Sequence, residues 1–493
     1  MKRLARTLVI WGTSSGAGKS VLVTALARVA ARRGIDAVPY KAQNMSNNAR
    51  VVPRSGDGGL GEIGSAQYFQ ALAAGVLPHT DINPVLLKPE RDTASQVVLH
   101  GVVDRALSAM GWRERSATLA VAAREGFDRL AARHELVIVE GAGSPAEINL
   151  APQDYVNLGV ARWAREHGEM AALLVTDIDR GGAFAHLHGT WTLLPDDLRG
   201  ALAGFVLNRF RGDAALLAPA PQQLQALTGV PMAGVLPMRR DHGLPEEDGL
   251  FDDAPRGVGA ARLRVAVVAA PHISNLDEFQ PLARVPGLRL VWAREAGQLE
   301  GVDWIVLPGS KQTSGDLAWL RAQGLDAAIA RHAALGGMVL GICGGMQMLG
   351  RSLHDPEGHD GEAVTNMPGL GLLPLRTEFA DDKRLRAAPV RFGAPRGAWA
   401  LLAGLSLPAY EIRCGRTLAD GGEAVLHDDA GLPIGWQHRN VLGLVAHGLF
   451  ESPAVLRTLF GASVPTLETA FDTLADLVEE HLDAALLRRC LGA

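Results

Sequence analysis

The sequence predicts two α/β domains in tandem, followed by a short helical tail. Short apolar, β-branched runs alternate with longer amphipathic stretches, an acidic and then Gly/Ala/Arg-rich stretch interrupts this pattern, and the pattern then restarts. The chain has 493 residues, which is too long for one ordinary hydrophobic core. We therefore expect domains at residues 1–255 and 262–455 and a helical tail at 456–493.

The first domain is predicted to be a doubly wound parallel sheet, because its apolar runs are separated by stretches long enough for helices. The first such stretch, "SVLVTALARVAARRG", has apolar residues at helical spacing and ends at Gly34. The expected strands are "TLVIWG", "DAVPYK", "ELVIVEGAG", "AALLVTDID", "GFVLNRF" and "PMAGVLP".

The second domain follows a predicted linker, "LPEEDGLFDDAPRGVGAARLR". Its expected strands are "LRVAVVAAP", "DWIVLPGS" and "GGMVLGICGG", so it is also an α/β domain. The tail, from Thr466 to the end, is predicted to form one amphipathic helix.

The composition is typical of a globular protein, with 47% hydrophobic and 20% charged residues and a formal net charge of −5. This balance gives no reason to expect nucleic acid or a membrane as a partner, and no apolar run approaches the ~20 residues of a membrane span. The three cysteines indicate neither a disulfide framework nor a metal cluster, and the N-terminus does not resemble a signal peptide. We expect a cytoplasmic protein; its oligomeric state is not predicted.

A glycine-rich stretch, "GTSSGAGKS", follows the first strand and opens the first helix, which is the setting of a phosphate-binding loop. Its backbone amides would surround phosphate oxygens, Lys19 would reach the β- and γ-phosphates, and the Ser20 hydroxyl would bind Mg²⁺. Thr13 stands where the usual motif has its first glycine, and Gly16 and Gly18 complete the loop. The alternative is an ordinary glycine turn with a chance lysine.

Polar residues at other strand ends support a nucleotide site. Glu140 ends its strand and is a candidate Mg²⁺ ligand. Asp177 and Asp179 end another strand and are candidate contacts for the substrate. Asp179 is also a candidate helix cap. Asn208 is expected either to contact a purine or to hold a turn.

Cys343 lies between an apolar strand and a helix, in "GICGGMQMLG". The glycines permit a tight turn that exposes a nucleophile, and backbone amides of the turn, including that of Gly344, would hold an oxyanion. His447, after the strand "VLGLVA", is the candidate base, and Gly309 and Ser310 could supply a second oxyanion donor. The alternatives are a small buried thiol and a structural histidine.

Together these features resemble triad-type (class I) glutamine amidotransferases fused to a dethiobiotin-synthetase-like ATP domain, and among these the cobyric acid synthase family. The stretches that carry the resemblance cover nearly the whole chain: "YKAQNMSNNA", "GEIGSAQYFQALAAG", "DINPVLLKP", "SQVVLHG", "VEGAGSPAEINL", "DIDRGGAFA", "NRFRGD", "LPEEDGL", "VLPGSKQT", "GICGGMQMLG", "YEIRCGRT" and "HGLFES".

The resemblance implies that glutamine is hydrolysed at Cys343 with His447 as base. The ammonia would amidate the b, d, e and g carboxylates of adenosylcobyrinic acid a,c-diamide after ATP·Mg²⁺ has phosphorylated them, so the implied substrates are glutamine, ATP and a corrinoid. No permanently bound cofactor is implied. Gln347 matches a glutamine-binding position or is a helix-surface amide, and Lys41 and Asn44 would contact phosphate or the substrate carboxylate.

Two departures from the amidotransferase pattern concern the site. Leu449 stands where a triad carboxylate is common, and Glu451 is two residues further on, so we expect Cys343 to work in a dyad. "YEIRCGRT" has Arg413 and Cys414 where related sequences often have His-Met.

Two other functions compete with this interpretation. The sister enzyme cobyrinic acid a,c-diamide synthase would perform the same chemistry on the a and c acetates; "KAQNM" and "DINPVLLKP" favour the first family. A partitioning-type ATPase with an inactive amidotransferase domain would carry a second lysine near the start of its phosphate loop, and "GTSSGAGKS" has none.

Overall fold

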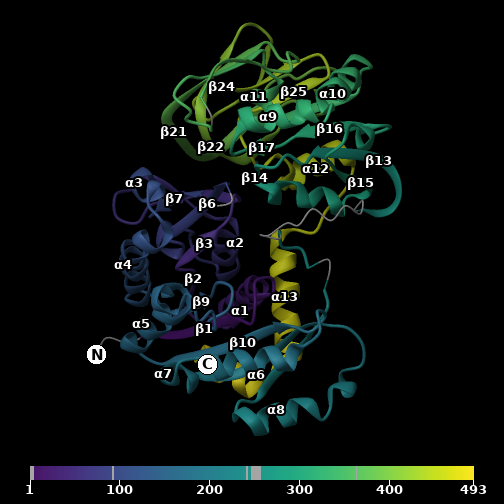
Figure 1. The fold of residues 1–493 in the computed structure, drawn as a ribbon. Helices are drawn as coiled ribbons and strands as arrows, with labels where there is room; N and C mark the ends of the chain where they lie inside the picture. Colours follow the sequence, from purple (N-terminus) through teal and green to yellow (C-terminus); the bar gives the residue numbers. More distant parts are fainter. Residues whose placement is uncertain (1–4, 92–93, 240–241, 246–256, 362, 493) are drawn as a thin grey trace. The chain divides into compact units, whose positions relative to one another are not determined.

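The computed structural model describes residues 5–91, 94–239, 242–245, 257–361 and 363–492 (Figure 1). The chain forms two compact units that are not consecutive in sequence. The first unit contains residues 1–46, 52–248 and 465–493, and the second contains 47–51 and 249–464. Both ends of the chain and a long internal stretch therefore build the first unit, and the five residues between its first two stretches belong to the second.

The first unit contains a six-stranded sheet in which every neighbouring pair is parallel. All six strands expected from the sequence are present, and the prediction of a doubly wound parallel sheet is confirmed. In sheet order they are β12 (Met232–Pro237), β11 (Leu202–Phe210), β10 (Met170–Asp177), β1 (Arg6–Gly12), β9 (Leu136–Glu140) and β2 (Ala37–Tyr40).

Helices cover both faces of this sheet because alternate residues of its strands point to opposite sides. On β1, Leu8 and Ile10 pack into one apolar cluster and Val9 and Trp11 into another. The first cluster includes residues of α1 (Lys19–Arg32), α2 (Ser65–Ala74), α13 (Leu467–His481) and α14 (Ala484–Leu491). The second includes residues of α4 (Trp112–Ala131), α5 (Val160–His167), α6 (Ala183–Leu193), α7 (Asp196–Arg199) and α8 (Ala220–Thr228).

The predicted first helix ends where its glycine indicated, since Gly34 has φ +70 just beyond α1. The tail forms two helices rather than the single helix we expected. Leu482 is extended between them, the Asp483 backbone N–H donates to the Ala233 carbonyl oxygen, and the Asp483 side chain caps α14.

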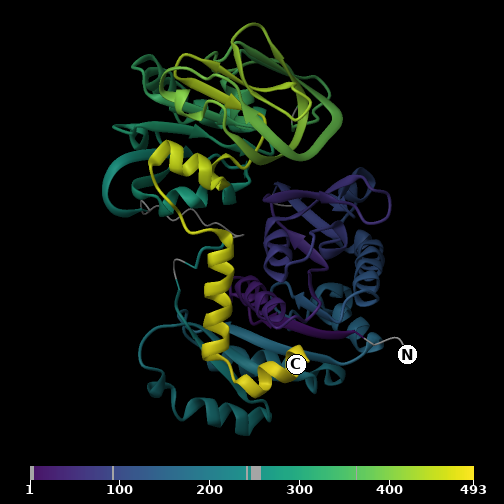
Figure 2. The same ribbon diagram turned by 180° about the vertical axis from the view of Figure 1, so that it is seen from behind.

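Figures 1 and 2 both show α13 beside α1, and ion pairs join the two helices. These pairs are Arg28–Asp472, Arg32–Asp476 and Arg33–Glu479. The tail is therefore part of the cover of the first sheet.

The chain also forms smaller sheets that we did not predict. One has four strands: β3 (Gln43–Met45), β6 (Val85–Arg91), β7 (Ala94–Leu99) and β8 (Val102–Asp104), with α3 (Arg105–Ala109) after it. Another pairs β4 (Ala49–Pro53) with β5 (Leu60–Gly64).

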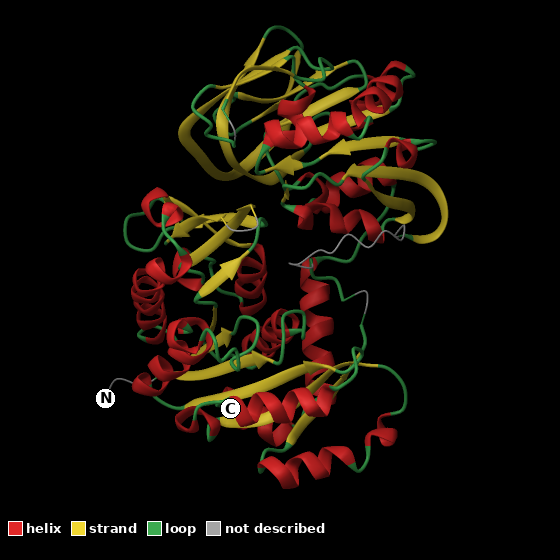
Figure 3. Cartoon of the chain, in the orientation of Figure 1, coloured by secondary structure: helices red, strands yellow, loops and turns green. Residues whose placement is uncertain are grey.

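The second unit is built on a larger sheet, whose strands are drawn in yellow in Figure 3. Its parallel part runs in the order β15 (Pro286–Ala293), β13 (Val258–Val268), β16 (Trp304–Leu307), β18 (Met338–Ile342) and β25 (Val441–Leu444). A mostly antiparallel part continues from β25 through β24 (Pro433–His438), β23 (Glu423–His427), β21 (Leu375–Phe392), β19 (Ser352–Asp355) and β20 (Val364–Pro368), with β22 (Ser406–Ala419) paired to β21.

The helices of the second unit are α9 (Thr313–Ala322), α10 (Leu325–Ala334), α11 (Gly344–Leu349) and α12 (Pro453–Phe460), and β14 (Ile273–Ser274) pairs with β17 (Gly309–Ser310). The α/β class predicted for this domain is confirmed. The predicted linker, residues 244–264, is wrong at its end, because residues from Val258 onward form β13; residues 246–256 lie outside the described part of the chain. Among the described residues, no helix is both long and apolar enough to cross a membrane.

Candidate active site

The thiol site of the second unit forms where four neighbouring parallel strands end. The carboxyl ends of β13, β16, β18 and β25 lead respectively to Glu278, to Gly309 and Ser310, to Cys343 and to His447. Parallel strands present their carboxyl ends at one edge of the sheet, which is where ligands bind in open α/β folds. The topology therefore gathers residues that are up to 169 positions apart.

Cys343 occupies a strained turn between β18 and α11. Its φ of 50 and ψ of −110 are rare for a residue with a side chain, and such strain typically stores about 1–3 kcal/mol. Its N–H donates to the Leu444 carbonyl oxygen at 2.7 Å. A Cβ at Gly345 would lie only 1.9 Å from the Leu307 carbonyl oxygen, so the turn needs glycine there. The glycines thus allow the close approach that fixes the thiol.

The residues expected to hold an oxyanion lie around this turn. A Cβ built on Gly344 would be 2.8 Å from the Ser310 backbone nitrogen, and one on Gly309 would be 2.9 Å from the imidazole Cε1 of His447. The Ser310 hydroxyl donates to Asp316 at 2.6 Å and thereby fixes this turn. The structure therefore brings Gly309, Ser310, Gly344 and His447 together.

His447 is buried and is paired with a carboxylate. Its Nδ1 lies 2.8 Å from Oε1 of Glu278, and the Gly448 N–H donates to Oε2 of the same carboxylate at 3.1 Å. Burial alone would lower the pKa of His447, but the Glu278 carboxylate and the Cys343 thiol together raise it to about 10. An imidazole with this pKa is held as the imidazolium, the form that can give a proton to a leaving nitrogen.

Sequence reasoning missed Glu278, and the expected dyad is wrong as a description of the geometry. Leu449 is buried and Glu451 pairs with Arg50, so neither occupies the place of a triad carboxylate. Glu278 lies 169 positions before His447, in the 3₁₀ segment η5 (Leu276–Arg284). The available signal was the acidic pair Asp277–Glu278 in a loop after an apolar strand.

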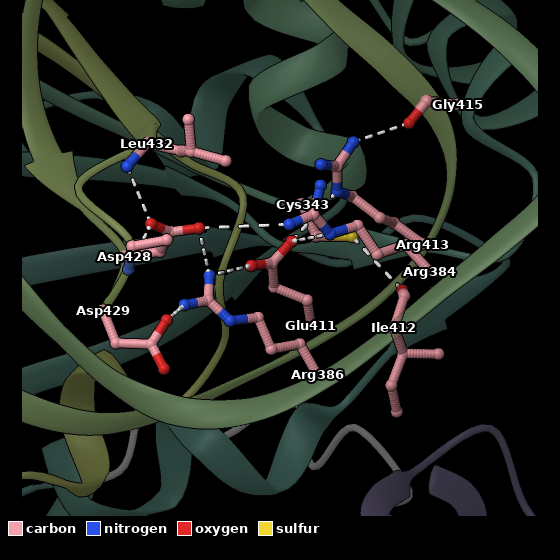
Figure 4. A network of polar contacts seen from close by, with 11 residues as sticks. Cys343, Arg384, Arg386, Glu411, Ile412, Arg413, Gly415, Asp428, Asp429 and Leu432 are labelled. Atoms are coloured by element: carbon pink, nitrogen blue, oxygen red, sulfur yellow. Dashed lines mark hydrogen bonds and ion pairs between the residues drawn. The ribbon is translucent and has the colours of Figure 1, made fainter. Parts of the chain in front are cut away.

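Charged side chains of β21, β22 and the turn after β23 form a network beside the thiol (Figure 4). The Cys343 Sγ lies 3.7 Å from the Ile412 carbonyl oxygen on β22. The network contains the arginines Arg384, Arg386 and Arg413 and the carboxylates Glu411, Asp428 and Asp429. The three positive charges are matched by three negative ones, so the network fixes this wall of the site without offering a net charge.

Gln347 is buried on α11 and is not the helix-surface amide that was the alternative to a binding role. It is 4% exposed, its Oε1 accepts from the Thr313 hydroxyl at 3.3 Å, and its Nε2 donates to the Cys414 carbonyl oxygen at 3.4 Å. Near it, burial raises the pKa of Asp360 to about 8. Gln347 lies one turn of α11 beyond the nucleophile, where its amide is able to take part in binding an amide substrate.

The nucleotide site of the first unit also forms at strand ends. The carboxyl ends of the adjacent strands β11, β10, β1, β9 and β2 lead to Asn208, Asp177, the loop 13–18, Glu140 and Lys41.

The loop 13–18 has the conformation that its glycines allow. Gly16 and Gly18 have φ values of +71 and +100, in the region that favours glycine. The Lys19 ammonium donates to the Ser14 carbonyl oxygen at 2.9 Å and to the Gly143 carbonyl oxygen at 3.0 Å, so it reaches across the mouth of the loop.

Glu140 is the centre of a buried polar cluster. Its Oε1 accepts from the Ser20 hydroxyl and from the Lys41 ammonium, each at 2.8 Å, and Gln70 donates to Oε2. Burial would raise the pKa of Glu140, but Lys41, Gln70 and Ser20 together lower it. Lys41 thus holds Glu140 ionised, which is a contact that we did not predict.

The remaining candidates take different places. Thr13 bonds to the Thr176 hydroxyl at 2.8 Å. The Asn208 amide donates to the Ala17 carbonyl oxygen at 2.9 Å, so it fixes the phosphate loop. The buried Asp177 carboxylate accepts from the Arg209 guanidinium at 3.0 Å.

Asp179 is paired with Arg211 and does not cap α6, since Gly182 precedes that helix; the helix-cap alternative is wrong. Asn44 is buried at 3% exposure.

A magnesium ion fits the residues around Glu140. The described residues contain no group of three or more His, Cys, Asp or Glu side chains able to hold a metal by themselves. Magnesium commonly takes one or two carboxylates together with substrate phosphates, and Ser20 and Glu140 are an adjacent pair of this kind. The Gln70 Oε1 is buried without a hydrogen-bond partner beside them, which is a further oxygen for the ion or its water.

Comparisons with known proteins agree with these two sites. The CobQ/CobB/MinD/ParA nucleotide binding domain family matches residues 8–250, and the CobB/CobQ-like glutamine amidotransferase domain family matches residues 264–455.

Full-length relatives are similar across the whole chain, and each is named cobyric acid synthase. The chain is 58% identical to that of Variovorax paradoxus over 98% of both chains, and 60% identical to that of Paracidovorax citrulli over 98% of both. It is 59% identical to that of Methylibium petroleiphilum over 99% of this chain and 97% of the relative. The resemblance predicted from the sequence is confirmed: the chain belongs to the cobyric acid synthase family.

Proposed function

We propose that this enzyme amidates the b, d, e and g side-chain carboxylates of adenosylcobyrinic acid a,c-diamide, with glutamine as the source of ammonia and ATP as the source of energy. The observation that carries the proposal is that one chain holds both the Cys343–His447–Glu278 arrangement and the phosphate loop with Lys19, Ser20 and Glu140. The first arrangement suits amide hydrolysis, and the second suits phosphoryl transfer.

In the proposed glutaminase reaction, the Cys343 thiolate attacks the amide carbon of glutamine. The backbone amides around Gly344 and Ser310 would stabilise the oxyanion, as their closeness supports. His447 gives its proton to the leaving nitrogen, ammonia departs, and a thioester remains. Water then attacks the thioester with His447 as base, which releases glutamate and restores the thiol.

In the proposed synthetase reaction, a substrate carboxylate oxygen takes the γ-phosphoryl group of ATP and ADP leaves. Ammonia then attacks the acyl carbon, the C–O bond to phosphate breaks, and an amide and inorganic phosphate form. Lys19 and the loop amides would hold the phosphate oxygens. Magnesium, held by Ser20 and Glu140, would neutralise charge on the phosphates.

The other candidate residues are assigned by position. Thr13, Gly16, Gly18 and Asn208 shape the phosphate loop, and Lys41 keeps Glu140 ionised. We propose Asn44 as a contact for the corrinoid carboxylate and Asp177 as a contact elsewhere on the substrate, because both are buried polar residues of the same unit. Asp179 is a weaker candidate, since its side chain is held by Arg211.

Gln347 is proposed to bind the glutamine substrate in the second unit. We also place the reaction in the cytoplasm, which three free cysteines support.

The deciding experiment supplies purified protein with ATP, glutamine and the a,c-diamide and follows the corrinoid by mass spectrometry. We expect the mass of the corrinoid to decrease in four successive steps. Each step equals the mass difference between a carboxylic acid and its amide. No change in the mass of the a,c-diamide would refute the proposal, and conversion of cobyrinic acid to its diamide in a parallel assay would identify the sister reaction.

A variant separates the two half-reactions. Cys343→Ala should abolish synthesis with glutamine and retain synthesis with free ammonia, because it removes only the ammonia source. Loss of ammonia-driven synthesis in a folded Cys343→Ala protein would contradict this division of labour.

A further inference from the structure

A five-residue segment from the first half of the chain docks beside the histidine of the thiol site. Residues 47–51 belong to the second unit, although the residues on both sides of them belong to the first. The Asn48 side chain accepts from the Leu276 N–H at 2.9 Å, and the Ala49 N–H donates to the Asn275 side chain at 3.1 Å. The segment is therefore fixed to the start of η5, the element that carries Glu278.

Arg50 is the charged residue of this segment, and it is 4% exposed. Its guanidinium donates to Asp277 on η5, and it donates at 2.8 Å to Glu451 on η8 (Leu449–Glu451). Burial raises the pKa of Glu451, the Asp277 and Glu278 carboxylates raise it further, and the Arg50 guanidinium opposes this rise. Arg50 therefore balances negative charge around the partner of His447.

Arg50 also reaches the imidazole through an aromatic ring. Its guanidinium carbon lies 4.7 Å from the centre of the Tyr410 ring, and the Tyr410 ring stacks on His447 with centres 5.2 Å apart and planes at 19°. The two backbones are joined as well, because the His447 N–H donates to the Tyr410 carbonyl oxygen at 2.9 Å. The Tyr410 hydroxyl is buried without a hydrogen-bond partner, so the side chain contacts Arg50 and His447 through its aromatic ring.

These contacts hold the imidazole from two sides. Glu278 fixes the Nδ1 edge, and Tyr410 covers one face of the ring. A ring that is free to tilt would lose alignment with Cys343, and misplacement of a catalytic group by about 1 Å can lower the rate by about 10²-fold.

We infer that Arg50 is a positioning residue for His447: its guanidinium presses Tyr410 against the imidazole and neutralises Asp277 and Glu451 beside Glu278. The inference rests on the proposed glutamine hydrolysis, and it assigns a part of the glutaminase site to a segment that lies about 290 residues before the nucleophile in sequence. The inference also separates the effect of the positive charge of Arg50 from that of its planar guanidinium. Lysine at position 50 would keep the charge but lack the planar group that stacks on an aromatic ring.

The test measures glutamine hydrolysis by the full-length enzyme and the rate at which iodoacetamide alkylates Cys343. Arg50→Met should lower kcat and the alkylation rate by about 10- to 30-fold, with the KM for glutamine within about twofold, because the groups around Gln347 are untouched. Arg50→Lys should recover part of the loss. Arg391→Met, which removes an exposed arginine of the same unit, is the matched control and should behave as wild type.

A second pair of variants keeps the inference testable if Arg50→Met does not fold. Tyr410→Leu removes the ring and should lower kcat about tenfold, and the conservative Tyr410→Phe should restore most of the activity, because the lost hydroxyl has no partner.

Wild-type kcat and alkylation rate in both Arg50→Met and Tyr410→Leu would overturn the inference, as would a change confined to KM. Absence of glutamine hydrolysis in the wild-type protein would instead refute the proposed function, so the two failures are distinguishable.

Discussion

Replacing Glu278 by glutamine should disable glutamine hydrolysis while leaving the fold intact. Glu278 and His447 are 0% and 1% exposed as side chains, and the pair is joined at 2.8 Å. Breaking a buried ion pair typically costs about 3–5 kcal/mol, and each 1.36 kcal/mol is a tenfold change in rate. Because glutamine retains one neutral hydrogen bond, we expect kcat to fall by about 10²- to 10³-fold.

The same variant should change the pH dependence of the reaction. The pKa of His447 is about 10, so the imidazolium form that stabilises a thiolate persists through the alkaline range. Without the Glu278 charge, only the Cys343 thiol opposes the effect of burial, so the pKa of His447 falls below its wild-type value. The alkaline limb of kcat/KM should therefore move to lower pH in Glu278→Gln.

The raised pKa of His447 also makes the stability of the fold depend on pH. Because the pKa is raised in the folded state, the His447 pair contributes stability that is fully present below pH 6.5 and is lost as pH rises through about 10. Urea titrations at several pH values measure it, and the contribution should be missing in Glu278→Gln.

Initial rates of glutamate release over a pH series are the assay, and the exposed Glu300→Gln is the matched control. A Glu278→Gln enzyme with wild-type kcat and an unmoved alkaline limb would show that the carboxylate contact is structural only.

Three further outcomes follow from the packing and the phosphate loop. Lys19→Ala should abolish corrinoid amidation with either glutamine or ammonia, as measured by mass spectrometry, because its ammonium spans the loop mouth; residual ammonia-driven synthesis would contradict this. Gly345→Ala should lower the free energy of unfolding by about 1–3 kcal/mol or more, because its Cβ meets the Leu307 carbonyl oxygen. Gly297→Ala is the control for this variant in thermal melts, because a Cβ added at Gly297 has no atom within 4 Å. Deleting residues 465–493 should destabilise the first unit, seen as faster proteolysis of its fragments; an unchanged digestion pattern would contradict the packing role of the tail.

The parallel strands and the two nucleophile- and phosphate-binding turns could be predicted because their signals are local. Apolar runs of strand length marked β1, β9 and β18, and glycines adjacent to Lys19 and Cys343 marked the turns. Each of these features depends on residues within one short window of sequence.

The missed features depend on contacts between distant residues. Glu278 meets His447 only because β13 and β25 end at the same sheet edge, and a carboxylate in a loop carries no local sign of this. The two-helix tail depends on Asp483, whose backbone bonds to Ala233. Helical periodicity continues through this break, so a pattern-based prediction merges α13 and α14.

The position of α13 and α14 on the first sheet has a consequence for synthesis of the chain. Domains generally fold in order from the N-terminus as they emerge from the ribosome. Here the face of the sheet that carries Leu8 and Ile10 lacks part of its cover until the last residues are made. The second unit, complete at residue 464, emerges before that cover does. The N-terminal domain is thus the last to finish folding, and a chain truncated by premature termination exposes an apolar sheet face on which chaperones and proteases can act.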